Sequence, residues 1–354
     1  MDKNNNQFNK RLIKLDGKVW EFIARIDEIK GKWSFGSKLT PSILTTLHHS
    51  VLITSSGAST RIEGSQLSDE EVERVMRGLS TTKFRDRDVQ EVKGYLELLS
   101  NIFDSFETLP LREGVIQHLH KAMLKYSEKD KLHSGKYKQE ENAVAIQKEN
   151  GEIGQIIFET TQAWLTQKEM TEIVEWTYSE LEKKEIHPLL VIGNFLVEFL
   201  KIHPFKDGNG RLSRILTNIL LLRAGYLYMP YVSHEQIIEK RKEEYYTTLR
   251  QSQGTFKTKN QSIEAWLLFF LSVVEEQSIR AIALLETEHL EDILSQKQLE
   301  VWNYIGSVED ASAGDIVKYT DVGRPTVNQS IEKLLRLNKI KRIGQGRATR
   351  YKKI

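Results

Sequence analysis

His203-Pro204-Phe205-Lys206-Asp207-Gly208-Asn209-Gly210-Arg211-Leu212-Ser213-Arg214 is the stretch of sequence from which the fold and the chemistry are most readily inferred. Gly208, Asn209 and Gly210 are expected in a turn that runs into a helix. Glycines let successive backbone amides point into one concavity, and the N-terminus of a helix adds a partial positive charge. The segment therefore predicts a cradle for phosphate groups.

Four side chains of this stretch suit chemistry on such a cradle. Arg211 and Arg214 are three residues apart on the first helical turn, so both can face a polyphosphate. Asp207 offers the hard oxygen ligand that Mg²⁺ prefers, and His203 is the residue type of a general base. Together they predict nucleotidyl or phosphoryl transfer. The alternative is a plain helix–helix turn with surface charges, and the length of the string argues against it.

The string resembles the Fic family motif, His-Pro-Phe-x-Asp/Glu-Gly-Asn-Gly-Arg-x-x-Arg, at every defined position, and the resemblance covers roughly residues 110–255. It implies a protein adenylyltransferase that moves AMP from ATP, with Mg²⁺ or Mn²⁺, onto a Ser, Thr or Tyr hydroxyl of a target protein or of itself. Another transferred group, such as a phosphoryl group, stays open. Attack at the α-phosphorus needs positioning and charge neutralisation more than covalent catalysis.

The resemblance also implies a role for each motif residue. His203 is the catalytic base and Asp207 the metal ligand. Arg214 orients the γ-phosphate. The other residues implied in ATP binding are Gly208, Asn209, Gly210, Arg211 and Ser213.

Residues 142–158 carry the main β signal of the chain. Apolar residues in 142–147 and 153–158 flank a turn that contains Asn150-Gly151, which is typical of a hairpin. In Fic proteins a hairpin at this place clamps an extended segment of the target by strand addition. By that resemblance Val144, Ala145, Ile146 and Gln147 lie over the nucleotide. Without the motif, an ordinary surface hairpin would be the default interpretation.

Tyr245 and Gln253 are further candidates for nucleotide binding. The segment from Glu243 to Leu249 resembles the family region that lines the adenine pocket. Tyr245 would contact the nucleoside and Gln253 would bind the base. The alternative is that paired tyrosines on a helix belong to the core and its rim. The other histidines, including His120, show no metal-ligand spacing and are expected in the core or on the surface.

Ser59-Thr60-Arg61-Ile62-Glu63-Gly64 resembles the inhibitory motif of the family, Ser/Thr-x-x-x-Glu-Gly/Asn. The resemblance implies an inhibitory helix over about 55–64, in which Glu63 pairs with Arg214 and Ser59 belongs to the same motif. A carboxylate competes directly with a phosphate for a guanidinium. Low basal activity is the expectation, and removal of AMP by the same enzyme stays open. Alone, the pattern would indicate only a surface helix end.

The C-terminal region is basic, with a formal net charge of +6 from residue 301 onward against −4 before it. Residues 297–354 resemble a winged helix-turn-helix, with 324–337 as the recognition-type helix and 340–353 as the wing. DNA phosphates would contact Arg324, Lys341 and Arg347. The alternative is a module for protein interaction or dimerisation, and a homodimer stays open.

We expect a mainly α protein: a Fic-type helical bundle with a β-hairpin flap and a small C-terminal winged helix-turn-helix domain. Expected helices include 87–105, 111–126, 169–183, 187–202, 211–224, 235–252 and 262–290, from apolar residues three and four apart. The expected domains are an N-terminal helical region 1–105, a catalytic domain 106–290 and the winged helix 291–354.

Composition narrows the setting of the protein. The 354 residues contain no cysteine, which excludes disulfides and thiol nucleophiles. No signal peptide or membrane span is expected, so we predict a cytoplasmic protein without a membrane partner. A function of another class stays open: a DNA-binding transcriptional regulator that uses the Fic-like core as a nucleotide sensor. In that case His203→Ala would leave its biological activity intact.

Overall fold

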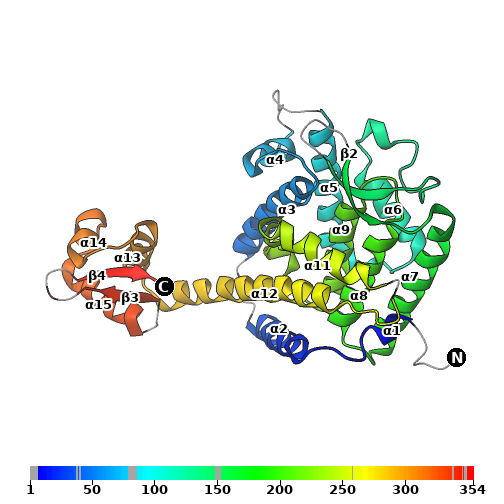
Figure 1. Ribbon diagram of the computed structural model, residues 1–354. Helices are drawn as coiled ribbons and strands as arrows, with labels where there is room; N and C mark the ends of the chain where they lie inside the picture. Colours follow the sequence, from blue (N-terminus) through cyan, green and yellow to red (C-terminus); the bar gives the residue numbers. More distant parts are fainter. Residues whose placement is uncertain are drawn as a thin grey trace. The chain divides into compact units, whose positions relative to one another are not determined.

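The computed structural model describes residues 7–36, 39, 41–78, 86–147, 153–256, 258–336, 339–344, 346 and 349–354. The chain divides into two compact units, residues 1–282 and 283–354, and each is described by itself (Figure 1). Both are mainly helical. Within the described part of the chain, every helix is too short or too polar to cross a bilayer.

The first unit is a helical bundle with one β-hairpin. Its α-helices are α1 (Gln7–Lys10), α2 (Gly17–Gly36), α3 (Pro41–Ile62), α4 (Asp69–Met76), α5 (Asp86–Ser105), α6 (Glu113–Met123), α7 (Thr166–Lys183), α8 (Pro188–Ile202), α9 (Asn209–Arg223), α10 (His234–Lys240), α11 (Lys242–Gly254) and the first part of α12 (Glu264–Ile293), which continues past residue 282. Short 3₁₀ turns occur at Phe106–Thr108, Glu128–Asp130, Ala163–Leu165 and Met229–Tyr231.

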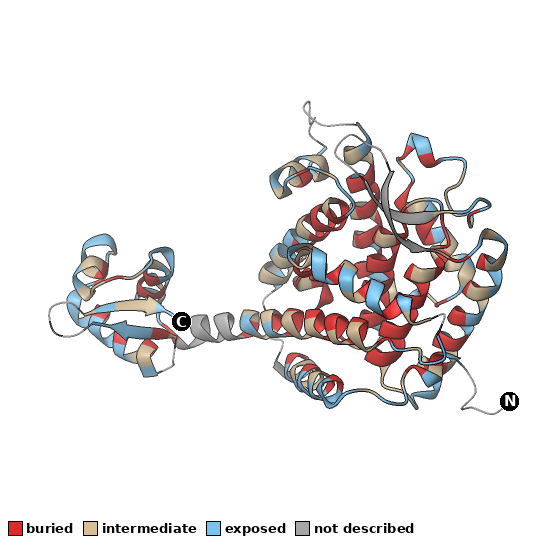
Figure 2. Cartoon of the chain, in the orientation of Figure 1, coloured by how far each residue is buried: buried red, intermediate tan, exposed pale blue. Residues whose placement is uncertain are grey.

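Helices α8 and α9 form the centre of this bundle, and Figure 2 shows buried residues concentrated along them. The sequence of α8 is apolar nearly all round, which is typical of a helix enclosed by others. Pro188 occupies its first turn, where the missing N–H is tolerated. Because residues 203–208 join α8 to α9, this segment is fixed between the two most enclosed helices of the unit.

A buried carboxylate ties the N-terminal helices to this centre. Glu235 of α10 accepts hydrogen bonds from Tyr95 of α5 at 3.0 Å and from Asn218 of α9 at 2.8 Å. Its second oxygen accepts from Ser233, whose hydroxyl in turn accepts a hydrogen bond from Ser55 of α3 at 2.8 Å. A buried charge is tolerated only with such partners. Helices α3, α5, α9 and α10 are therefore held in one polar network.

The expected helix 235–252 is two helices, α10 and α11, and that expectation was wrong in this respect. The chain leaves helical geometry at Arg241, where φ is −118° and ψ is 31°. The guanidinium of Arg241 makes two hydrogen bonds to Glu244 and lies 4.9 Å from the ring centroid of Phe269. These contacts stabilise the break, which the helical spacing of the sequence does not reveal.

The predicted hairpin consists of β1 (Ala143–Gln147) and β2 (Ile153–Glu159), paired antiparallel with two irregularities in register. The predicted turn at 148–151 lies outside the described residues. Thr160 and Asn142, next to the strands, share hydrogen bonds of 2.6 and 2.7 Å that close the base of the hairpin. Lys138 donates to both side chains and also to the carbonyl of Ile202. The hairpin base is thereby attached to the end of α8.

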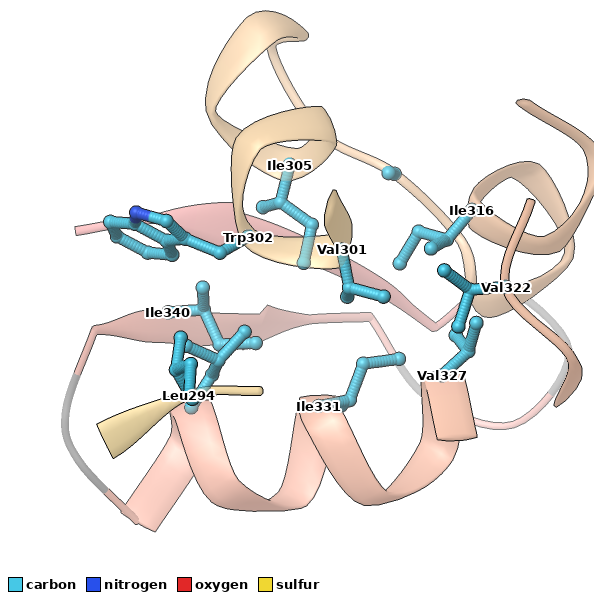
Figure 3. Close-up of a cluster of buried hydrophobic side chains, with 11 residues drawn as sticks. Leu294, Val301, Trp302, Ile305, Ile316, Val322, Val327, Ile331 and Ile340 are labelled. Atoms are coloured by element: carbon cyan, nitrogen blue, oxygen red, sulfur yellow. The ribbon is translucent and has the colours of Figure 1, made fainter. Parts of the chain in front are cut away.

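The second unit packs three helices against a hairpin, in the order expected for a winged helix-turn-helix. These are α13 (Gln296–Ser307), α14 (Ala313–Tyr319), α15 (Arg324–Arg336), β3 (Ile340–Ile343) and β4 (Arg350–Lys353). Figure 3 shows side chains from all three helices and β3 converging on one core. The buried members are Leu294, Val301, Trp302, Ile305, Ala311, Ile316, Val322, Val327, Ile331, Leu334 and Ile340.

Candidate active site

His203 ends α8 in an unusual backbone conformation. Its φ of 51° lies in the left-handed region, which is unfavourable for a residue with a side chain. The ring nitrogen Nδ1 lies 3.2 Å from the carbonyl oxygen of Leu200. Since a carbonyl can only accept, Nδ1 carries the proton, and Nε2 is the basic nitrogen of the neutral ring.

The surroundings keep His203 neutral at physiological pH. Burial of the imidazole, reinforced by the nearby charge of Lys138, lowers the pKa of His203 to about 4. The bond to Leu200 opposes this shift and is outweighed. The ring is therefore neutral, with Nε2 unprotonated, across the neutral range.

The side chain of Asn209 fixes the loop that follows. Its Oδ1 accepts the N–H of Phe205 at 2.9 Å, and its Nδ2 donates to the carbonyl of Phe205 at 2.8 Å. Asn142 donates to the same carbonyl at 3.0 Å. The Asn209 amide thus serves the loop itself. Any contact of Asn209 with a phosphate falls to its backbone N–H, one of the first amides of α9, which have no acceptor within the helix.

His120 of α6 stacks against the loop and hydrogen-bonds to it, a role that was not expected from the sequence. The N–H of Gly135 donates to its Nδ1 at 2.8 Å, so Nε2 carries the proton and donates to the backbone carbonyl of Asp207 at 2.9 Å. Its ring stacks on Phe205, with centroids 3.8 Å apart and planes within 9°. Complete burial lowers the pKa of His120 to about 4. The neutral ring is therefore a rigid brace for the loop.

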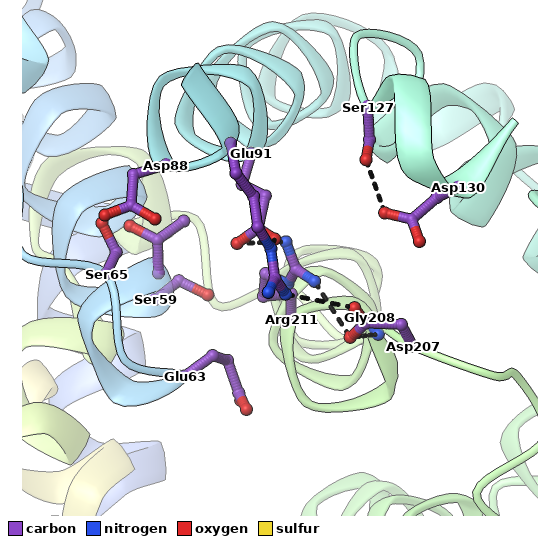
Figure 4. Close-up of polar contacts among 12 residues, drawn as sticks. Ser59, Glu63, Ser65, Asp88, Glu91, Ser127, Asp130, Asp207, Gly208 and Arg211 are labelled. Atoms are coloured by element: carbon purple, nitrogen blue, oxygen red, sulfur yellow. Dashed lines mark hydrogen bonds and ion pairs between the residues drawn. The ribbon is translucent and has the colours of Figure 1, made fainter. Parts of the chain in front are cut away.

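Asp207 and Arg211 close a ring of charges with two residues of α5. Arg211 lies 2.9 Å from Glu91 and 3.2 Å from Asp207 Oδ1. Figure 4 marks both contacts with dashed lines. Arg87 completes the ring, at 2.7 Å from Glu91 and 3.4 Å from Asp207 Oδ2. Arg211 and Glu91 are buried, so their charges need this pairing. Neither α5 residue was a candidate from the sequence.

Asp207 suits a metal ion that takes its other ligands from a bound phosphate compound and from water. Burial alone would raise the pKa of Asp207, but Arg211, the Gly208 amide and Arg87 outweigh it and bring the pKa below its ordinary value. The carboxylate is ionised and about one third exposed. Among the described residues, no group of three or more His, Asp or Glu side chains could enclose a metal. One carboxylate plus phosphates and water is a usual arrangement for Mg²⁺.

Arg214 turns to the opposite side, toward the end of α3. Its Nε donates to the hydroxyl of Ser59, and its Nη2 donates to the carbonyl of Ser59 and to Glu63 Oε1, all at 2.8 Å. Burial alone would lower the pKa of Arg214, but the Glu63 carboxylate outweighs it and raises the pKa above its ordinary value. The geometry therefore brings together the Ser59, Glu63 and Arg214 that the sequence analysis paired.

The Glu63 carboxylate also lies against the glycine loop. A Cβ placed on Gly210 would lie 2.2 Å from Glu63 Oε1 and 3.4 Å from Arg214 Nη1. Only glycine leaves room for a carboxylate so close to the start of α9. A negative group of this protein thus lies where the amides and Arg214 favour an anion.

Three of the remaining candidates, Tyr245, Gln253 and Ser213, are buried, and the side chains of the others are not described. Tyr245 is buried, with its ring 5.6 Å from that of Trp266 and 5.8 Å from that of Phe269. Gln253 is buried and donates to the carbonyl of Val197 in α8 at 3.3 Å. Ser213 donates its hydroxyl to the carbonyl of Gly210. In Val144, Ala145, Ile146 and Gln147 only the strand is described, not the side chains.

A small cavity lies beside Arg214 and Tyr245. Its volume is about 20 Å³, and its walls are mostly apolar side chains of α8, α9 and α12. A cavity of this size has room for about one water molecule.

Comparison with known proteins gives the motif a family context. Residues 110–221 match the Fic/DOC family. Over 150 residues the sequence is 29% identical to a protein adenylyltransferase Fic of Drosophila virilis, a match that covers 41% of this chain and 30% of that protein. The chain thus spans under a third of the length of this relative.

Solved structures show the fold. A Fic family protein from Desulfovibrio desulfuricans superposes with a TM-score of 0.63 at 23% identity, over 96% of this chain and 97% of that one. A Fic domain containing signaling protein from Bacteroides thetaiotaomicron gives a TM-score of 0.61 at 24% identity, over 74% of this chain and 97% of that one.

The lowered pKa of His120 predicts a pH dependence of stability. The ordinary pKa is 6.5 and the folded pKa about 4, so between these values the unfolded chain binds more protons. Stability should therefore fall as pH drops from 6.5 toward 4, by about 1.4 kcal/mol per pH unit from this group. His120→Gln, which keeps a donor for Asp207, should flatten this dependence.

Chemical denaturation in metal-free buffer at several pH values measures the effect. His118→Gln is the matched control, because His118 is exposed on the same helix. A His120→Gln protein with the same pH dependence as the wild type would contradict the assignment.

Proposed function

Since residues 110–221 form a Fic/DOC family domain, we propose that the chain transfers AMP from ATP to a hydroxyl group of a protein. The observation that carries the proposal is the single turn between α8 and α9. It places a neutral imidazole, an ionised carboxylate and two guanidinium groups around amides at the start of a helix. The name of the Drosophila relative supports AMP as the transferred group.

In the proposed reaction the hydroxyl oxygen of the target attacks the α-phosphorus of ATP. The bond from that phosphorus to the oxygen bridging to the β-phosphate breaks, and pyrophosphate leaves. Nε2 of His203 takes the hydroxyl proton, since Nδ1 already donates to Leu200. The products are an AMP ester of the target, pyrophosphate and a protonated imidazole.

The chain holds the triphosphate by charge and by backbone donors. We assign the amides of Gly208 to Gly210 to the α- and β-phosphates, Arg211 to the phosphates near Asp207, and Arg214 to the γ-phosphate. Asp207 is the residue that would hold Mg²⁺ or Mn²⁺. When bound, the cation neutralises charge on the phosphates as pyrophosphate leaves. A seated γ-phosphate aligns the α-phosphorus for attack.

The β1–β2 hairpin is the proposed docking element for the target. It is a two-stranded sheet in the described part of the chain, so each strand has one edge that no described strand pairs. An extended segment with a Ser, Thr or Tyr side chain could add to such an edge through main-chain hydrogen bonds. The hairpin base is attached to the end of α8 through Lys138, next to His203.

In this proposal the contact of Glu63 with Arg214 inhibits the enzyme. Arg214 would have to release the carboxylate before it could bind a γ-phosphate, and the carboxylate over Gly210 would repel the triphosphate. We propose that ATP binds productively only when the end of α3 moves. The same carboxylate would lie close enough to the loop to activate water, which supports removal of AMP as a second activity of this site.

Loss of the Glu63 carboxylate should activate the enzyme. Glu63→Gly should raise the incorporation of label from α-labelled ATP by roughly 10- to 100-fold, the equivalent of one charged hydrogen bond. His203→Ala in the same background should abolish it. Intact-mass measurement of the chain, and of other proteins added to the reaction, distinguishes a gain of AMP from a gain of phosphate.

Glu70→Gly is the control, because Glu70 is an exposed carboxylate in the first turn of α4. Activation by this control to the level of Glu63→Gly would show that the effect is not specific. Label that persists in His203→Ala would remove the proposed base.

Arg61 fixes the turn that carries Glu63. Its Nε and Nη2 bind the two oxygens of Glu239 in α10 at 2.6 and 3.0 Å. Its Nη1 donates to the carbonyl of Leu67 and lies 2.9 Å from Asp69. A Cβ on Gly57 would lie 2.6 Å from this nitrogen, so glycine there leaves space for the guanidinium. The end of α3 is thus attached to α10 and to the start of α4.

Release of this attachment should mimic part of the activation. Arg61→Ala should raise AMP incorporation several-fold, less than Glu63→Gly, because Glu63 would leave Arg214 more often. In the double variant Arg61→Ala should add nothing to Glu63→Gly. Arg77→Ala, which removes an exposed ion pair in α4, is the control. Additive effects of Arg61→Ala and Glu63→Gly would contradict the proposed role.

A further inference from the structure

Helix α15 presents a polar face away from the core of the second unit. Val327, Ile331 and Leu334 point into the core. The exposed positions of the helix are Arg324, Pro325, Asn328, Gln329, Glu332 and Arg336. A face of this kind contributes nothing to the core, and its side chains are available to a partner.

The hairpin beside α15 carries cations in an unfavourable arrangement. In the β3–β4 register Lys341 lies directly opposite Lys352, and Ile343 lies opposite Arg350. Like charges directly across an antiparallel pair are destabilising.

Carboxylates of the unit pair with two cations of β4, Arg350 and Lys352, while the described cations of β3 have no such partner. Arg350 pairs with Asp310 and with Asp315, and Lys352 lies 3.6 Å from Glu309. Among the described residues, no carboxylate lies within ion-pair distance of three exposed cations. These are Arg324 at the start of α15 and Lys341 and Arg342 on β3. We call Arg324, Lys341 and Arg342 the basic set; Arg347 lies outside the described residues.

We propose that α15 and the basic set bind duplex DNA, independently of AMP transfer. An α-helix of about 10–12 Å fits the major groove, which is about 12 Å wide. Asn328 and Gln329 carry the amides that pair with adenine, and Glu332 on the same face can accept from the amino group of cytosine. The basic set supplies cations for phosphate contacts, which position a protein on the duplex.

The composition of the α15 face favours DNA over a protein partner. Protein interfaces have an apolar or aromatic centre with charged residues at the rim. None of the large exposed hydrophobic residues of this unit in the described part of the chain belongs to α15; they are Val308, Tyr319, Ile343 and Ile354. Exposed amides flanked by cations suit base edges and phosphates instead.

The test measures binding of the full chain to a fluorescein-labelled duplex of mixed sequence by anisotropy. Affinity should fall steeply between about 50 and 200 mM salt. The triple variant Arg324→Ala/Lys341→Ala/Arg342→Ala should lose on the order of 10²-fold in affinity at about 0.1 M salt, with a log–log salt slope shallower by about 2–3. Asn328→Ala/Gln329→Ala should keep the slope and weaken binding only to duplexes selected from a random pool.

The control Lys14→Ala/Lys18→Ala/Arg250→Ala removes the same net charge from exposed positions of the first unit and should bind as the wild type does. Circular dichroism verifies that each variant is folded. The proposal is overturned if the wild type does not bind duplex at low salt, or if both triple variants lose equal affinity. Equal displacement of the duplex by polyglutamate would also overturn it, since that outcome indicates an acidic protein partner.

Discussion

Two buried guanidinium groups, those of Arg211 and Arg214, impose the main constraint on the first unit. A buried charge that lacks a partner costs several kcal/mol, so each guanidinium must be paired wherever α9 is folded into the bundle. Arg211 finds its partners in Asp207 and in Glu91 of α5, and Arg214 finds Ser59 and Glu63 at the end of α3. The N-terminal helices are therefore part of the environment of the motif. They also share the buried network of Glu235, which fixes their distance from α9.

This constraint explains why the Glu63 carboxylate lies beside Arg214. Arg214 and the amides at the start of α9 favour an anion. Glu63 supplies one negative charge to Arg214 and lies over Gly210, so it balances part of that positive charge. A triphosphate would bring more charge than Glu63, and its cation would bring a partner for Asp207. In the proposed function, competition between two anions for one guanidinium thus couples the position of α3 to catalysis, while the Arg61–Glu239 contact sets how readily α3 moves.

The sequence was most informative where function is encoded in neighbouring residues. The cradle, the helices on both sides and the pairing of Glu63 with Arg214 follow from two short motifs, and the structure places those residues together. His120, Glu91 and Arg87 could not be found in this way, because their roles depend on α5 and α6 packing against a loop about 85–120 residues later in the chain. Tyr245 and Gln253 present a different difficulty. Their spacing along the helix fits core residues as well as site residues, and both side chains are buried in the structure. The break at Arg241 depends on contacts with Glu244 and Phe269 that periodicity does not register.

The central claim is that Arg214 exchanges Glu63 for the γ-phosphate of ATP. A crystal structure of the Glu63→Gly chain with Mg²⁺ and a non-hydrolysable ATP analogue tests it most directly. The account predicts the γ-phosphate within hydrogen-bond distance of the Arg214 guanidinium, with the α- and β-phosphates on the amides of Gly208 to Gly210. A triphosphate bound elsewhere, or an Arg214 that makes no contact with it in an occupied site, would contradict the account.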